Sequence, residues 1–148
     1  MPTLAKNRRA RFEYEILDTL EAGLVLSGAE VKSIRTGHAS LAGAYVTFHG
    51  NEPHLTNAHI APYAFAVKNE SYDPTQTRKL LLKKKEIAYL RGKLQEKGLT
   101  AIPLSLYTKQ RLIKLEIGLA RGKKTHDKRA SIKKREVDRE IQRALSEG

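Results

Sequence analysis

The chain contains no cysteine and no tryptophan among its 148 residues. The lack of cysteine excludes disulfides, cysteine-ligated zinc, iron–sulfur clusters and thiol nucleophiles, so packing alone must hold the fold. Apolar residues make up 40% of the chain, enough for one modest core. They form no run near the roughly 18 residues of a membrane span, and the polar N-terminus is unlike a signal peptide. We therefore expect a soluble cytoplasmic protein with no membrane segment.

Acidic residues are also in deficit. Sixteen Asp and Glu stand against 28 Lys and Arg, which gives a formal net charge of +12 and favours an anionic partner such as nucleic acid. Aromatic residues are few, so a protein that reads the shape of a folded RNA is favoured over one that stacks many single-stranded bases. Charge alone leaves DNA and RNA both open. We expect Tyr14 and Tyr45 to lie in the core.

The last fifth of the chain carries a large share of the positive charge. Residues 120–148 hold ten basic and five acidic side chains, and their large apolar residues are too few to order them alone. Val137, Ile141 and Leu145 would nevertheless form one apolar stripe on a helix, so this tail could fold on a partner. A solvated tail that only aids solubility is the alternative. We predict a body at residues 1–119 and a basic tail at 120–148, disordered when free.

The body alternates in the manner of β-strands. Every second residue of 12–16 is apolar, and residues 44–56 are typical of a hairpin that turns at Gly50-Asn51. Residues 99–107 and 112–119 predict a second hairpin, in which Pro103 should lie at an edge or a bulge.

Two stretches have helical spacing. Residues 83–97 predict an amphipathic helix that stops at Gly98, and residues 29–35 a shorter helix ended by Gly37. With several short strands and no βαβ repeat, the expected fold is mainly β: a small antiparallel barrel with helices packed on it.

Signals for catalysis are weak. His49, His54 and His59 are spaced by five residues but have no metal-binding motif around them, so surface positions are expected. The chain has no serine-nucleophile motif and no glycine-rich phosphate loop. We predict no metal and no cofactor. A metal-free hydrolase stays open as an alternative, with a histidine and one of four glutamates: Glu13, Glu15, Glu21 or Glu30.

Basic clusters are the stronger signal. They occupy residues 6–11, residues 78–85 on both sides of a Leu triplet, and residues 121–124, and each suits phosphate contacts. Glu21 interrupts this basic pattern beside Gly23, which permits a tight turn. A carboxylate there could accept hydrogen bonds from base amino groups or the 2′-OH of RNA, or it could only pair with a nearby lysine.

Motifs along nearly the whole chain resemble the SsrA-binding protein (SmpB) family. The matching segments are residues 7–11 (NRRAR), 14–16 (YEI), 21–24 (EAGL), 30–35 (EVKSIR), 60–63 (IAPY), 78–82 (RKLLL) and 118–124 (GLARGKK), with Leu104 and Tyr107. The resemblance implies an oligonucleotide-binding-type (OB-like) barrel and a noncatalytic adaptor. Such an adaptor binds the tRNA-like domain of transfer-messenger RNA (tmRNA) and delivers it to stalled ribosomes for trans-translation, where it stands in for a missing anticodon stem. Alanyl-tRNA synthetase and elongation factor Tu are implied as functional associates, and we expect a monomer.

The resemblance also implies site residues. Glu21, Leu81 and Lys114 match positions that support tmRNA binding, although Leu81 could act only by packing. Strand alternation points Lys114 outward, as a phosphate contact requires. The remaining predicted RNA contacts are Asn7, Arg8, Arg9, Arg11 and Lys79.

Ribosome contacts are implied for the tail, which becomes helical in the empty messenger channel and acts at the decoding centre. The matching residues are Gly122, Lys123, Lys124, His126, Asp127, Lys128 and Arg129. Phe12 stands where many relatives have a histidine that stacks on ribosomal RNA, and it keeps a stacking face without the ring nitrogens. A basic ribosome-associated protein that binds no tmRNA is the runner-up interpretation.

Overall fold

The computed structural model describes residues 2–64 and 71–123. Seven antiparallel strands form one sheet in the order β1-β8-β9-β2-β7-β5-β4, and β3 pairs with β6 separately. The strands are β1 (Thr3–Lys6), β2 (Tyr14–Leu24), β3 (Ala39–Ser40), β4 (Tyr45–His49), β5 (Glu52–Thr56), β6 (His59–Ile60), β7 (Arg78–Leu81), β8 (Leu99–Lys109) and β9 (Leu112–Gly122). The helices are α1 (Ala10–Glu13), α2 (Gly28–Arg35) and α3 (Lys84–Leu94).

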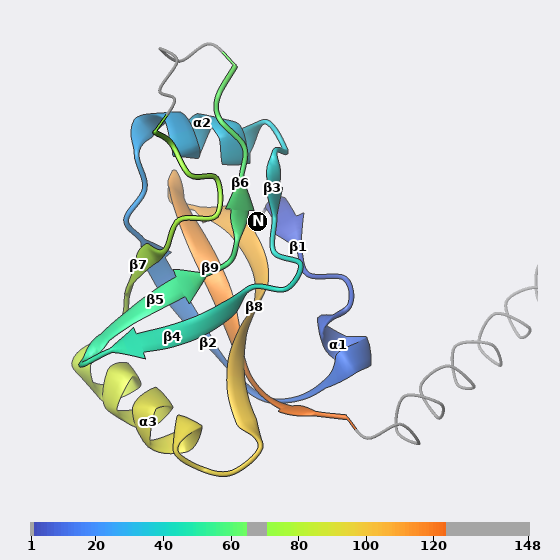
Figure 1. Ribbon diagram of the computed structural model, residues 1–148, viewed down its shortest axis with the longest axis vertical. Helices are drawn as coiled ribbons and strands as arrows, with labels where there is room; N and C mark the ends of the chain where they lie inside the picture. The colour runs from blue at the N-terminus through green and yellow to red at the C-terminus, as the bar shows by residue number, and fades with distance from the viewer. Residues whose placement is uncertain (1, 65–70, 124–148) are drawn as a thin grey trace, which may run out of the picture.

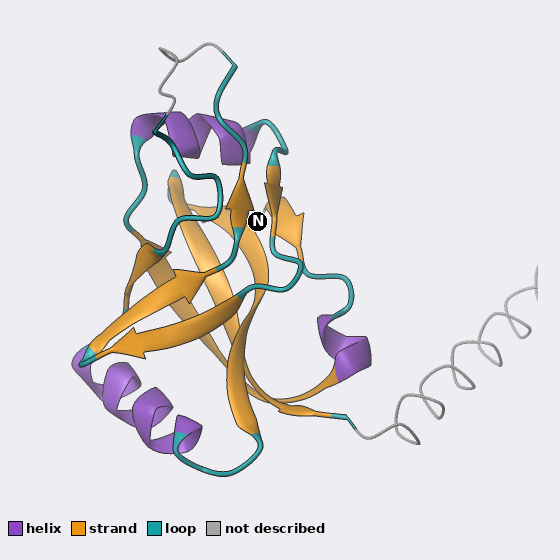
Figure 2. Cartoon of the chain, viewed as in Figure 1, coloured by secondary structure: helices purple, strands orange, loops and turns teal. Residues whose placement is uncertain are grey.

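The sheet is strongly curved. It curls until β4 lies against β8, although within the described ranges no strand ladder joins β4 to β8 or to β1. Figure 1 shows α2 at one end of the sheet, beyond β3 and β6, and α3 at the other end beside the tip of the β4–β5 hairpin. Figure 2 shows α1 at the margin that carries β1. The predicted mainly β, antiparallel fold with packed helices is confirmed. In the parts described, no helix is long and apolar enough to cross a membrane.

Strand alternation separates the core from the outer face of the sheet. Ala22, Leu115 and Leu106 are neighbours across three strands and are all buried. They pack in one cluster with Ile34 of α2 and Leu90 of α3. Because successive side chains of a strand point to opposite faces, residues one position away along β2, β9 and β8 point outward. This outer face carries the candidate site.

Both predicted hairpins are present. Gly50, with φ +66°, lies in the turn between β4 and β5. The turn between β8 and β9 is formed by Gln110 and Arg111, which both have positive φ (51° and 67°), as a tight hairpin turn requires. Arg35 of α2 donates to the carbonyl of Arg111 at 2.9 Å, which holds this turn against the helix.

Pro103 lies at a bulge in β8, as predicted. The β8–β9 register shifts between Pro103 and Ser105. Asn7, which follows β1, supplies hydrogen-bond donors to this irregular part of β8. Its side-chain amide donates to the Pro103 carbonyl at 3.0 Å, and its backbone N–H donates to the Leu104 carbonyl at 2.8 Å. The irregular strand thereby keeps its backbone acceptors satisfied.

The prediction of a strand over residues 12–16 is wrong at its start. Phe12 and Glu13 belong to α1, where their N–H groups donate to the carbonyl of Arg9 at 3.1 and 2.9 Å. The Arg9 and Glu13 side chains also form an ion pair at 3.1 Å, four residues apart. Alternation over five residues did not reveal these local contacts.

Other boundaries differ by smaller amounts. Helix α3 ends at Leu94, and Gly98, with φ +83°, lies in the turn that follows rather than at the helix end. Tyr45 is 44% exposed and therefore is not in the core. Strand β9 continues to Gly122, so the predicted boundary at residue 119 falls inside a strand.

Candidate nucleic-acid interface

The outer face of β2, β7 and β9 gathers three residues that are far apart in the sequence. Gly23 of β2 is paired with Leu81 of β7 on one side and with Lys114 of β9 on the other. Two residues before Gly23, Glu21 lies on the same face of β2, and all four line one open cleft. Glu21, Leu81 and Lys114 therefore form one group, and Lys79 and Lys83 line the same cleft and add positive charge.

Gly23 makes this group possible because it has no side chain. A Cβ atom there would lie 3.3 Å from Leu81 Cβ and 3.7 Å from Lys114 Nζ. Gly23 thus allows the side chains of Leu81 and Lys114 to approach each other closely across β2. The predicted strand end is confirmed, because β2 ends at Leu24, but Gly23 is part of the strand and makes no tight turn.

Leu81 is exposed where a structural leucine would be buried. Alternation along β7 buries Arg78 and Leu80, while Lys79 and Leu81 point outward, and Leu81 is 53% exposed. Lys79 makes an ion pair with Glu52 at 3.4 Å in which both side chains are well exposed, so the pair adds little to stability. A large apolar side chain between lysines is suited to burial against a base or ribose.

Glu21 is held by two donors from β8. The hydroxyl of Tyr107 donates to Glu21 Oε2, and Lys109 Nζ lies 3.2 Å from Oε1. The hydrogen bond from Tyr107, helped by Lys109 and Lys114, outweighs desolvation and lowers the pKa of Glu21. Burial and the adjacent carboxylate raise the pKa of Tyr107, which stays a protonated donor. Glu21 does pair with a lysine, as one of the two interpretations held.

The N-terminal basic residues line a second cleft. Lys6, Arg8 and Arg9 line it together with Ser40 and Tyr45. The two clefts share no lining residue.

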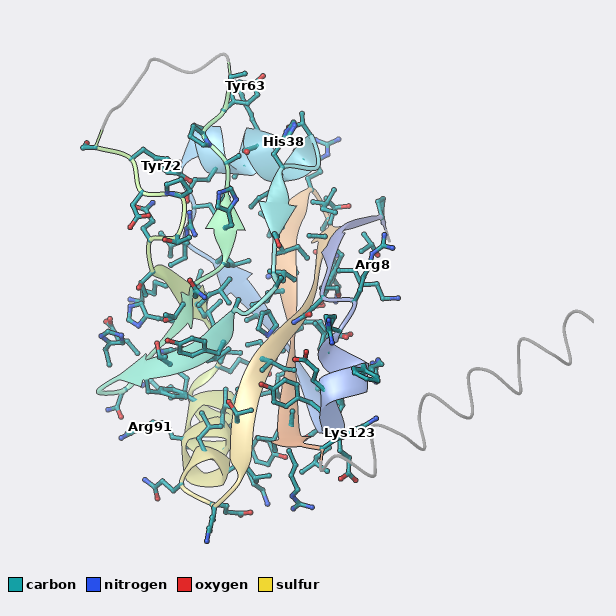
Figure 3. The ribbon with its side chains drawn as sticks, turned by 45° about the vertical axis from the view of Figure 1, so that its right-hand side comes forward. Arg8, His38, Tyr63, Tyr72, Arg91 and Lys123 are labelled. Carbon is teal, nitrogen blue, oxygen red and sulfur yellow. The ribbon has the colours of Figure 1, made fainter. Side chains whose placement is uncertain are left out.

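Residues of this second region also contact one another. The Arg9 guanidinium lies 5.6 Å from the centroid of the Phe12 ring, a cation–π distance. Figure 3 shows Arg8 and Lys123 on the side of the molecule that carries β1 and α1.

The end of β9 joins this second region. Gly122 pairs with Tyr14, the Lys123 N–H donates to the Glu13 carbonyl at 2.9 Å, and Lys123 Nζ donates to the Arg11 carbonyl at 2.9 Å. Helix α1 therefore brings Arg11 and Phe12 beside the start of the predicted tail. The other predicted ribosome contacts lie outside the described residues: Lys124, His126, Asp127, Lys128 and Arg129.

Comparison with known proteins decides the family. The SmpB protein family model matches residues 4–147. The chain belongs to the SmpB family. The SsrA-binding protein of Synechococcus sp. (strain JA-3-3Ab) is 56% identical over 143 residues, which cover 97% of this chain and 93% of the relative. The SsrA-binding protein of Gloeobacter violaceus (strain ATCC 29082 / PCC 7421) is 54% identical over 146 residues, covering 96% of this chain and 93% of the relative.

A solved structure has the same fold. It is described as "tmRNA-SmpB: a journey to the center of the bacterial ribosome", and its matching chain superposes with a TM-score of 0.69 at 45% identity. The match covers 86% of this chain and 92% of that chain. The resemblance seen in the SmpB motifs of the sequence is therefore confirmed.

One SmpB-like motif residue has a role that the sequence concealed. Arg78, grouped above with the phosphate-binding cations, is only 3% exposed, and its Nη2 lies 2.8 Å from Glu30 Oε2. Desolvation by itself raises the pKa of Glu30, but hydrogen bonds from the Ser27 N–H and from Arg78 lower it overall. Arg78 therefore cannot meet phosphate. The sequence signal for the burial of Arg78 was strand alternation in β7, because a buried Leu80 places Arg78, two residues earlier, on the same face.

The histidines show how little supports the hydrolase alternative. His49 and His54 face each other across the β4–β5 hairpin, with ring centroids 4.5 Å apart. His59 lies in β6, which pairs with β3 and not with the β4–β5 hairpin that carries the other two histidines. In the described ranges no group of three or more His, Asp or Glu is placed to hold a metal ion. Two of the candidate acids, Glu21 and Glu30, have Tyr107 and Arg78 as partners instead of a histidine.

Proposed function

We propose that this protein is a noncatalytic tmRNA-binding adaptor, which delivers tmRNA to stalled ribosomes for trans-translation and stands in for the missing anticodon stem. The observation that carries the proposal is the convergence of Glu21, Leu81 and Lys114 around Gly23 in one cleft. Relatives named SsrA-binding proteins and the solved structure described as tmRNA-SmpB support it.

The residues of this cleft suit different parts of an RNA. Lys79 and Lys114 can contact phosphates, which gives affinity without sequence preference. Leu81 can pack against an unstacked base or a ribose, and the Glu21 carboxylate can accept from a base amino group or a 2′-OH. Such a mixture of charge, apolar surface and a fixed acceptor favours recognition of a folded RNA over generic binding to phosphate.

We assign Phe12, Gly122 and Lys123 of the second region to ribosome binding. Arg9 and Arg11, which lie beside them around α1, are assigned to RNA binding. Residues 120–148 form the basic tail in this proposal, and Lys124, His126, Asp127, Lys128 and Arg129 contact ribosomal RNA at the decoding centre and messenger channel as the tail becomes helical. Asn7 shapes this region through its bonds to β8, and Arg8 adds charge.

The proposal extends to the cellular setting. The protein acts as a monomer in the cytoplasm, and it associates functionally with alanyl-tRNA synthetase and elongation factor Tu through the tmRNA that they charge and carry. Both RNA surfaces lie on one chain, so no second copy is required to bridge the two RNAs.

A titration tests the proposal. The purified protein is titrated with the tRNA-like domain of tmRNA and with an ordinary tRNA of similar length, at low and at high salt. Both RNAs should bind more weakly at high salt, because phosphate contacts release counterions. A preference for the tmRNA domain that persists at high salt supports the proposal. Equal binding that collapses with salt would leave a generic basic RNA-binding protein.

A further inference from the structure

The Glu21 side chain crosses a whole strand to reach its partners. On the outer face Glu21 of β2 stands opposite Glu116 of β9, and Glu116 stands opposite Ser105 of β8. The donors to Glu21 are Tyr107 and Lys109, which follow Ser105 on the same face of β8. The carboxylate is therefore held over β9 by residues two strands away.

Without these donors Glu21 would not stay over β9. Its side chain is 37% exposed and has three rotatable torsions, and it stands directly opposite the like charge of Glu116. Repulsion between the two carboxylates would turn Glu21 towards solvent. The Tyr107 hydroxyl and the Lys109 ammonium group offset that repulsion and fix one orientation.

The fixed carboxylate can still accept hydrogen bonds. An ionised carboxylate has about four lone-pair positions on its two oxygens. Tyr107 uses one on Oε2, and Lys109 lies 3.2 Å from Oε1 and 3.4 Å from Oε2, which leaves acceptor capacity on both oxygens. Glu21 also lines the cleft of Leu81 and Lys114, so these oxygens are within reach of a bound RNA.

We propose that Tyr107 is a positioning residue for RNA recognition, whose hydroxyl, together with Lys109, holds the Glu21 carboxylate in the orientation that accepts hydrogen bonds from tmRNA. The inference rests on the proposed function and deepens it. Fixing the acceptor before binding removes an entropic cost from the association step, so affinity depends on a hydroxyl that itself needs no contact with the RNA.

The substitution Tyr107→Phe tests this, because it removes only the hydroxyl. We expect affinity for the tRNA-like domain to fall by about fivefold to tenfold. In a Glu21→Ala background the same substitution should change affinity hardly at all, because Tyr107 acts through Glu21. The matched control is Tyr89→Phe, since the Tyr89 hydroxyl donates to a carboxylate oxygen of Asp18 at 2.7 Å away from this cleft. It should leave affinity unchanged.

A second measurement separates positioning from a structural role. The carboxyl carbon of Glu21 is followed by NMR in a pH titration of the free protein, and Tyr107→Phe should raise the pKa of Glu21 while the melting temperature stays close to that of the unmodified protein. A structural role would instead lower the melting temperature, and an unmoved pKa of Glu21 would contradict the assigned hydrogen bond.

The outcomes are distinguishable. If Glu21→Ala weakens binding but Tyr107→Phe does not, or if Tyr107→Phe weakens binding equally with and without Glu21, the positioning role is overturned and the proposed function stands. If Glu21→Ala leaves tmRNA affinity unchanged, the positioning role is overturned, whereas the proposed function falls only if the preference for the tmRNA domain is lost at high salt.

Discussion

Arg78 and Glu30 form a buried ion pair across 48 residues of sequence, with Arg78 Nη2 2.8 Å from Glu30 Oε2. The same guanidinium donates to the carbonyls of Ala58 at 2.6 Å and Pro74 at 2.9 Å. The Arg78 side chain therefore links Glu30 of α2 to Ala58, which precedes residues 65–70, and to Pro74, which follows them. The pair is fully hydrogen-bonded, which is the condition under which a buried charge is tolerated.

Replacing Arg78 should be costly. Arg78→Ala leaves the Glu30 carboxylate buried without its partner, and we expect a loss of about 3–5 kcal/mol in the free energy of unfolding. Urea denaturation measures it. Lys79→Ala is the matched control, because this exposed neighbour should change stability by no more than about 0.5 kcal/mol. Equal effects of the two substitutions would refute the assigned role of Arg78.

Stability should fall in acid through the same pair. The pKa of Glu30 is lowered from its ordinary value of 4.5, so the unfolded chain takes up a proton at a higher pH than the folded chain does. The stabilisation is complete above pH 4.5 and is lost as the pH falls through the folded pKa. Urea unfolding at a series of pH values should show the advantage of the wild type over Glu30→Gln shrinking in acid. A gap that is constant with pH would contradict this.

Gly23→Ala should weaken tmRNA binding with little effect on stability. The added methyl group would lie 3.3 Å from Leu81 Cβ, so Leu81 would have to move by a few tenths of an ångström, and it would fill the space beside Lys114 Nζ at an ordinary contact distance of 3.7 Å. We expect affinity for the tRNA-like domain to fall by about fivefold, measured by titration. Gly92→Ala in α3 meets nothing within 4 Å, so it should keep full affinity and raise stability by about 0.5–1 kcal/mol. Unchanged affinity in Gly23→Ala would mean that this spacing is irrelevant to binding.

Truncation after Lys123 should separate the two RNA activities. This cut keeps all of β9 and the bonds of Lys123 to α1, whereas a cut at residue 119 would remove the end of a core strand. We expect the melting temperature and tmRNA affinity of residues 1–123 to match those of the full chain, while peptide tagging on stalled ribosomes is abolished. Loss of tmRNA affinity on this truncation would contradict the division into body and tail.

The hairpins were predictable because their signals are local. Gly50-Asn51 between two alternating runs specifies a turn, and Pro103 has to interrupt a ladder wherever it lies in a strand. Charge runs were less informative, because Arg78 and Lys79 are neighbours in sequence but lie on opposite faces of β7. The burial of Leu80, which depends on the packing of the whole sheet, shows which face of β7 is inside. It thereby distinguishes Arg78, which lies in the core, from Lys79, which lines the cleft.

Leu81 and Lys114 came from family resemblance, whereas residue chemistry singled out Glu21 but left open whether it contacts RNA or pairs with a lysine. Glu21, Leu81 and Lys114 are brought together by the register of three strands around a glycine. Their partner Tyr107 lies two strands from Glu21, and no spacing rule within one segment links the two residues. Such relationships depend on strand order, and the sequence did not predict the strand order.

The anchoring of Lys123 has a consequence for how the tail finds its target. Lys123 is bonded to Glu13 and Arg11, so the residues after it always start from α1, beside Phe12. Once an RNA has bound at α1, binding of the tail to the same RNA is an intramolecular step. The effective concentration of the tail near that RNA is then set by the length of chain that links them and not by the concentration of protein in solution. Avidity of this kind lets many weak basic contacts act together, and a flexible insert after Lys123 would dilute them without removing a single charge.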